Sequence, residues 1–128
     1  MNLEEFNTVK QGEIAQELEL NHAVTGKPTG VFVSLLSVHS RQYRQAFHDQ
    51  KIKFALLSEK GDAGFEAEPE CACEVLASVS TGIRGATDSD GNEIKPSHEL
   101  FLSFYAGSPN VADQVAEFVG DLGNFTKG

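Results

Sequence analysis

The chain has 128 residues, of which 40% are hydrophobic and 23% charged, and these proportions are typical of one globular domain with a single core. Nineteen acidic residues against ten basic ones give a net charge of -9, which opposes binding to nucleic acid or to anionic lipid. No apolar run approaches the ~20 residues that span a bilayer, and the acidic N-terminus is unlike a signal peptide, so we expect a cytoplasmic location.

An antiparallel β-hairpin is predicted near the N-terminus, after a lead-in over residues 1–12 that we expect to be loosely ordered. The run IAQELEL (14–20) alternates apolar and polar residues as a half-buried strand does. The run VFVSLLSV (31–38) is a second β-rich segment. Two glycines and a proline between the two runs indicate the turn that joins them.

A long helix is predicted next, over residues 41–57. Ser37 or Ser40 can cap its first turn. Its core side is predicted to carry, at near-heptad spacing, Tyr43, Ala46, Phe47, Gln50 or Lys51, and Phe54.

The middle of the chain combines loops with one short element. Residues 58–70 are acidic and contain glycine and proline, which indicates a solvated connection. Residues 71–82 favour a short helix with Leu76 on its inner face, while Val75 and Val79 leave a strand as the competing interpretation. An Asp-Gly pair within residues 87–96 predicts a turn-rich loop or a small hairpin.

Two helices are predicted at the C-terminal end, and they complete the fold. Ser97 is placed to cap HELFLSFYAG, and Ser108 to cap a last helix that has Pro109 at its first position. Residues 124–128 are expected to be loosely ordered. The prediction is therefore an α+β fold, a single domain over residues 1–128 in which an N-terminal antiparallel β-hairpin packs with about four α-helices.

The motifs of catalysis and of metal binding are missing or incomplete. Asp88, Asp90, Asn92 and Glu99 fall at ligand positions of a calcium loop, but Glu93 stands where that loop needs glycine, so an acidic turn is predicted instead. Cys71 and Cys73 lack the partner pair of a zinc site, and the four histidines are scattered. No nucleophile elbow or phosphate-binding loop occurs. We predict no enzyme, no metal and no cofactor.

The last predicted helix carries one continuous apolar face. Val111, Val115, Phe118, Val119 and Leu122 follow helical spacing, with Phe125 beyond them. Burying five such side chains contributes roughly 8–15 kcal/mol before entropy is counted, at about 1.5–3 kcal/mol each. Such a face has to be covered, either by the protein's own core or by another chain.

Three segments of the chain resemble the tail assembly chaperones of long-tailed, lambda-like bacteriophages and prophages. The first is ELELNHAVTGKPTGVFVSLLSVHSRQYRQAF (17–47), with its "TGKPTG" turn; the second is LASVSTGIRGATDSDGNEIKPSHE (76–99); the third is SPNVADQVAEFVGDLGNF (108–125), with "P-x-V-x-x-Q-V" and a terminal "NF". They follow one another in order over much of the chain. One departure is that this chain has no tryptophan, whereas related chains often carry one near Ile83.

The resemblance implies a non-enzymatic role in the bacterial host. Members of this family bind the long, helical tape measure protein, keep it soluble, and are displaced as tail tube subunits polymerise. We therefore expect the tape measure protein as a partner, with the tail tube protein and further copies of the chain as others, and absence from the mature virion. The partner-binding residues are predicted on the two C-terminal helices: Phe101, Phe104, Tyr105, Val111, Val115, Phe118, Val119, Leu122 and Phe125.

Two other functions remain open at this point. One is a structural virion component, such as a minor tail or head-tail connector protein. The other is a small hydrolase or binding protein with an unrecognised site, which the missing motifs disfavour. The family also makes a longer form by ribosomal frameshifting, which a protein sequence does not reveal.

Overall fold

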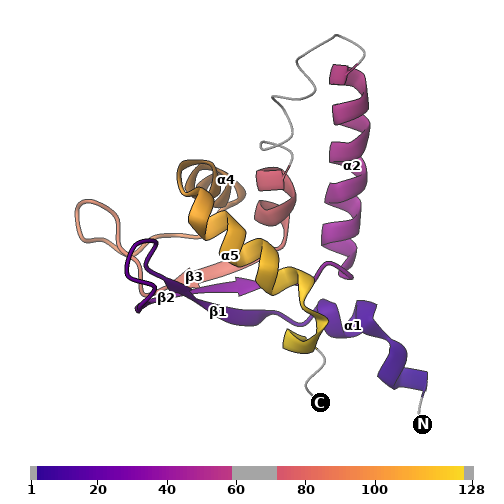
Figure 1. The fold of residues 1–128 in the computed structure, drawn as a ribbon, viewed down its shortest axis with the longest axis horizontal. Coiled ribbons are helices and arrows are strands. Elements are labelled where there is room, and N and C mark those ends of the chain that lie inside the picture. The colour runs from indigo at the N-terminus through magenta and orange to yellow at the C-terminus, as the bar shows by residue number, and fades with distance from the viewer. Residues whose placement is uncertain (1–2, 59–71, 126–128) are drawn as a thin grey trace.

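The computed structural model describes residues 3–58 and 72–125, and within them it confirms the α+β class (Figure 1). Residues 72–78 are also helical and lie between the second and third of the three strands. The elements in chain order, apart from that helical turn, are η1 (Leu3–Phe6), α1 (Thr8–Gly12), β1 (Gln16–Asn21), β2 (Pro28–Leu35), α2 (Arg41–Ser58), β3 (Ser80–Arg84), α4 (His98–Gly107), α5 (Pro109–Gly120) and η2 (Leu122–Asn124).

The sheet is antiparallel, with β2 in the centre between β1 and β3. The predicted hairpin is thus confirmed, with its strands shifted by a few residues. The prediction did not include β3. Residues 71–82 were expected to form either a helix or a strand, but the described part divides at Val79, so a helical turn precedes a strand.

The two faces of the sheet differ in polarity. Leu18, Val33 and Ile83 are register partners and form an apolar row across the three strands. On the other face Arg84 donates two hydrogen bonds to the Glu17 carboxylate, at 2.6 and 3.2 Å, and its guanidinium lies 3.8 Å from the centre of the Phe32 ring. The ion pair lowers the pKa of Glu17 and raises that of Arg84, and the hydrogen bond between them is the largest cause of both shifts. One face is therefore left for the helices to cover.

Helices α4 and α5 provide that cover (Figure 1). Phe101 and Tyr105 of α4 and Val115 and Val119 of α5 are almost fully buried, and they share one core with Val33 and Leu35 of the central strand. Residues 72–78 add Leu76 and Ala77, and Cys73 lies at the margin of the same core. The strand alternation and the helical spacing thus converge on a single hydrophobic cluster.

Local hydrogen bonds show which predicted helix caps form. Ser97 Oγ accepts from Leu100 N at 3.1 Å and Ser40 Oγ from Tyr43 N at 3.2 Å, which confirms these two caps. Ser108 occupies the N-cap position of α5 and Pro109 begins the helix, as predicted, but the Ser108 side chain makes no capping hydrogen bond. The 87–96 turn is closed by a bridge between Thr87 and Glu93.

Short helices lie in the parts of the two terminal segments that the structure describes, while residues 1–2 and 126–128 lie outside the described residues. Near the N-terminus η1 and α1 form, and Ser37 N donates to Gly12 O at 2.9 Å, which connects α1 to the segment after β2. At the other end Phe125 is buried and makes an edge contact with Phe118, so residue 125 belongs to the core. Ile14, predicted on the buried side of a strand, is exposed and precedes β1.

Helix α2 matches its predicted bounds to within one residue but not its predicted burial. Tyr43, Ala46 and Gln50 are half-buried, whereas Phe47 is 53% exposed and Lys51 is exposed. The helix stands beside the rest of the fold instead of lying across the sheet (Figure 1). The side chain of Phe54 and the connection predicted over 58–70, apart from the backbone of residue 58, lie outside the described residues. No helix among residues 3–58 and 72–125 combines the length and the apolarity needed to cross a membrane.

Two glycines give a matched test of the sheet. Gly85 and Gly91 have positive φ angles of 84° and 82°, but a Cβ at Gly85 would overlap the Gly30 carbonyl oxygen, whereas a Cβ at Gly91 would meet nothing within 4 Å. Gly91→Ala should cost about 1 kcal/mol of unfolding free energy through backbone strain. We expect Gly85→Ala to cost about 1–3 kcal/mol more because β2 and β3 must separate. Equal losses in urea unfolding would contradict this packing.

Tyr105 gives a pH test of the core. Burial raises its pKa to about 12, and its hydroxyl lies 2.6 Å from Ser80 Oγ. Because a tyrosine in the unfolded chain has a pKa of about 10, the free energy of unfolding should fall as pH rises from about 10 to about 12. Tyr105→Phe should lower the free energy of unfolding by about 1 kcal/mol at neutral pH, because the hydrogen bond to Ser80 is lost. The variant should then lose less of its stability than the wild-type protein as the pH rises. Urea unfolding of both proteins across this pH range measures the difference. An equal loss of unfolding free energy in the two proteins would contradict the role of Tyr105 in the alkaline decline.

Candidate functional site: an apolar groove beside the sheet

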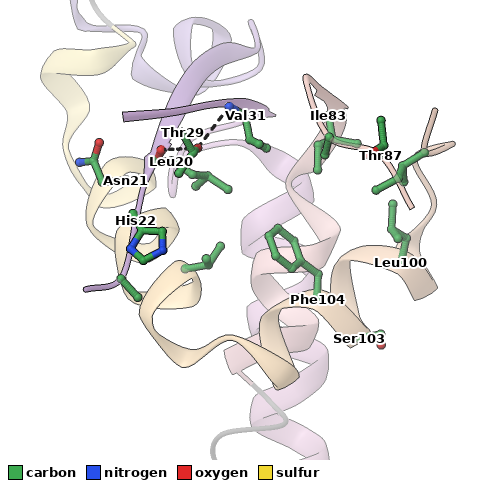
Figure 2. A pocket seen from close by; sticks show the side chains of 14 residues that line it. Leu20, Asn21, His22, Thr29, Val31, Ile83, Thr87, Leu100, Ser103 and Phe104 are labelled. Carbon is green, nitrogen blue, oxygen red and sulfur yellow. Dashed lines mark hydrogen bonds between the residues drawn. The ribbon is translucent and has the colours of Figure 1, made fainter. Parts of the chain in front are cut away.

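An open groove of about 540 Å³ lies between the sheet and the C-terminal helices (Figure 2). Its lining is mostly apolar. The Phe104 ring points into the space bounded by Leu20, Val31 and Ile83. The residues that line the groove are Leu20, Asn21, His22, Ala23, Thr29, Val31, Ile83, Ala86, Thr87, Ile94, Leu100, Ser103, Phe104 and Val111.

The groove exists because four segments meet without filling the space between them. Its floor is the apolar face of the sheet, where Ile83 lies beside its register partner Val33 and Val31 lies two residues before Val33 on β2. One wall is formed where α4 and α5 meet, with Phe104 supplied by α4 and Val111 by α5. The β1–β2 connection and the loop after β3 complete the rim.

Hydrogen bonds hold the rim on the side of the β1–β2 connection. Asn21 N donates to Gln114 Oε1 at 2.8 Å and Gln114 Nε2 donates to Asn21 O at 3.0 Å. These two hydrogen bonds connect α5 to the end of β1. Thr29 Oγ1 donates to Leu20 O at 2.6 Å and accepts from Val31 N at 3.2 Å, across the start of β2 (Figure 2). These bonds pair the backbone groups of Leu20, Asn21 and Val31 named here, so these groups do not interrupt the mostly apolar surface of the groove.

Leu100 and Ile94 differ from the other large apolar residues that line the groove. Both are half-buried and line the groove, yet neither is among the residues packed on the central core, as Val31, Ile83, Phe104 and Val111 are. They lie on α4 and on the loop after β3. Substituting them changes the groove without removing a core contact.

The nine predicted partner-binding residues divide into core and partly exposed positions. Phe101, Tyr105, Val115, Val119 and Phe125 are buried within the chain itself. Phe104, Val111, Phe118 and Leu122 are half-buried, and of these Phe104 and Val111 line the groove. Of the five residues predicted for the apolar face of the last helix, Val115 and Val119 are therefore buried in the chain's own core, and the other three keep part of their surface. Partner binding by these residues stays a prediction, and in this conformation only the half-buried ones keep surface for it.

Sequence reasoning missed the part of the groove that comes from the N-terminal half and from the loop after β3. Leu20 and Val31 were placed in strands, and Ile83 was noted only for the missing tryptophan. The signal that could have found them is the alternation along β1 and β2, once β3 is recognised as the neighbour of β2. Because β3 pairs across more than forty residues of chain, local patterns do not indicate it.

Polar side chains elsewhere form pairs rather than a reactive cluster. His98 Nε2 lies 2.8 Å from a Glu74 carboxylate oxygen, and Thr8 Oγ1 lies 2.6 Å from His39 Nδ1. Asp88 accepts hydrogen bonds from the backbone N–H groups of Asp90 and Asn92, so its carboxylate closes the acidic turn. Within residues 3–58 and 72–125 no group of three or more histidine, cysteine or acidic side chains could hold a metal ion.

Comparison of the chain with protein-family models, with curated proteins and with solved structures finds no match.

Proposed function

We propose that the chain is a tail assembly chaperone of a long-tailed bacteriophage or prophage, which binds the tape measure protein and keeps it soluble until tail tube subunits displace it. The observation that carries the proposal is an open apolar groove on a strongly acidic protein, next to the segments whose motifs resemble that family.

The groove fits the chemistry of such a client. An amphipathic helix binds a protein groove by placing apolar side chains, one turn apart, into an apolar trough. The groove supplies the trough through Leu20, Val31, Ile83, Leu100 and Phe104. Its size falls in the range of about 300–1,000 Å³ that is typical of binding pockets. It covers a short stretch of helix, so a long client needs many copies of the chaperone.

Charge supports the same role. A net charge of -9 on 128 residues keeps a complex with an apolar client dispersed, because like-charged copies repel one another at a distance. The client then gains solubility from each bound copy. Release needs only a competitor for the client's apolar face, and no chemical step by the chaperone.

A charged side chain inside the groove should abolish this activity. We expect Leu100→Arg to lower the yield of soluble tape measure protein about tenfold on co-expression, because the charged side chain would replace apolar surface that the client contacts. Ala116→Arg is the matched control, since it adds the same charge at an exposed position of α5 outside the groove. The yield on gels and the circular dichroism of both variants are measured. Full solubilisation by a folded Leu100→Arg protein would contradict a client-binding role for the groove.

The virion separates this proposal from a structural role. A chaperone displaced during tail assembly should be absent from purified particles and present in the lysate that produced them. Quantitative mass spectrometry of both fractions measures this. Recovery of the chain at a fixed number of copies per particle would overturn the chaperone proposal in favour of a structural component.

A further inference from the structure

The β1–β2 connection, over residues 22–27, forms one side of the groove and is built around His22. Two backbone hydrogen bonds join its ends, from His22 N to Lys27 O at 2.8 Å and from Gly26 N to His22 O at 2.9 Å. Both His22 and Ala23 line the groove (Figure 2). The conformation of this connection therefore sets one border of the groove.

The ring of His22 binds two backbone N–H groups at the tip of the connection. Val24 N lies 3.1 Å and Thr25 N lies 3.3 Å from His22 Nδ1. A backbone N–H group only donates, so Nδ1 accepts both hydrogen bonds, which an imidazole nitrogen does only when it carries no proton. Within residues 3–58 and 72–125 neither N–H group has another acceptor. The closed connection thus requires the neutral ring, with its proton on Nε2.

Protonation of the ring is incompatible with these two hydrogen bonds. An imidazolium carries an N–H group on both nitrogens, so Nδ1–H would then face two other donors. The His22 side chain is exposed and can turn into solvent, which leaves the N–H groups of Val24 and Thr25 to water. The hydrogen bonds between Asn21 and Gln114 do not involve the ring, so the base of the connection stays in place. Opening is confined to its tip.

His22 is the only one of the fourteen lining residues whose charge ordinarily changes near neutral pH. On the loop after β3 and on α4 and α5, the charged residues closest in sequence to the lining are Asp88, Glu93, Lys95, Glu99 and Asp113. On the sheet side they are Glu19, Lys27 and Arg84. Among the described residues none of them forms an ion pair with His22. A change in the charge of the lining near neutral pH therefore comes from His22.

We infer that His22 is a pH-sensitive latch on the groove: the neutral ring closes the β1–β2 connection, and protonation releases it and adds a positive charge to the lining. Both consequences act in the same direction. A loosened border and a charged side chain each reduce the apolar surface that the groove presents. Because histidine gains its proton as the pH falls, the groove is closed on this side at about pH 8 and open at about pH 5.

The latch is tested by NMR spectroscopy of the full chain as the pH is lowered from about 8 to about 5. The ring signals of His22 report its protonation. As the ring gains its proton, the amide proton signals of Val24 and Thr25 should move upfield. Their exchange with solvent, corrected for its intrinsic pH dependence, should rise about threefold to tenfold for the loss of one hydrogen bond each. The Lys10 amide donates to Asn7 Oδ1, an acceptor that does not titrate, and should not respond.

Two substitutions separate the latch from general effects of acid. His22→Asn provides a side-chain oxygen that accepts from the N–H group two residues on at any pH, so the acid response of the tip should disappear. His48→Asn removes an exposed histidine of α2 outside the groove and should leave the response unchanged. The inference is overturned by a response that persists in His22→Asn, by amides that stay unchanged while the His22 ring titrates, or by a ring that stays neutral to about pH 5.

The effect of the latch on a client rests on the proposed function and is measured separately. Pull-down of the tape measure protein by the wild-type chain should weaken about tenfold between about pH 7.5 and about pH 5.5, whereas His22→Asn should bind equally at both. A normal amide response with no client bound at either pH would support the latch and count against the chaperone proposal. Equal weakening in both proteins would show that the latch does not control client binding.

Discussion

The fold depends on covering one apolar face of a three-stranded sheet. Leu18, Val33 and Ile83 form a row across that face, and three strands without a cover would leave the row in water. The cover comes from the other end of the chain, where α4 and α5 contribute Phe101, Tyr105, Val115 and Val119. Because sheet and cover are far apart in sequence, neither the hairpin nor the helical pair buries its apolar side chains alone.

The same constraint accounts for the groove. Two short helices joined by a tight turn cover β2 fully at Val33 and Leu35, and less completely toward its start, where Val31 is half-buried. At that end α4 and α5 leave Phe104 and Val111 facing Val31 and Ile83 with space between them. The groove is thus the uncovered margin of the core, which is why its lining is apolar although the protein is acidic.

Local patterns predicted most of the elements but not the relations between them. The alternation around Leu18 and Leu20 and the caps at Ser40 and Ser97 are short-range features, and the structure confirms them. Which apolar face is buried depends on distant partners: Val115 and Val119 lie in the core because β1 and β2 lie beneath them, a fact that the spacing on α5 does not contain. The groove needs β3, which was missed, so only Phe104 and Val111 of its lining were among the predicted site residues.

Helices α5 and α2 differ in how their large apolar residues are distributed around the helix. On α5 the large apolar residues recur on one side, as expected of a helix that packs on a single core, and Val115 and Val119 on that side are buried. On α2 they are spread: Tyr43 is turned to the core, while Phe47, Ile52 and Leu56 remain in solvent among cations. Apolar residues scattered singly on a surface are ordinary in folded proteins and assign no partner by themselves. A regular apolar face on a helix is what the chain's own core requires, and α5 uses part of its face in that way.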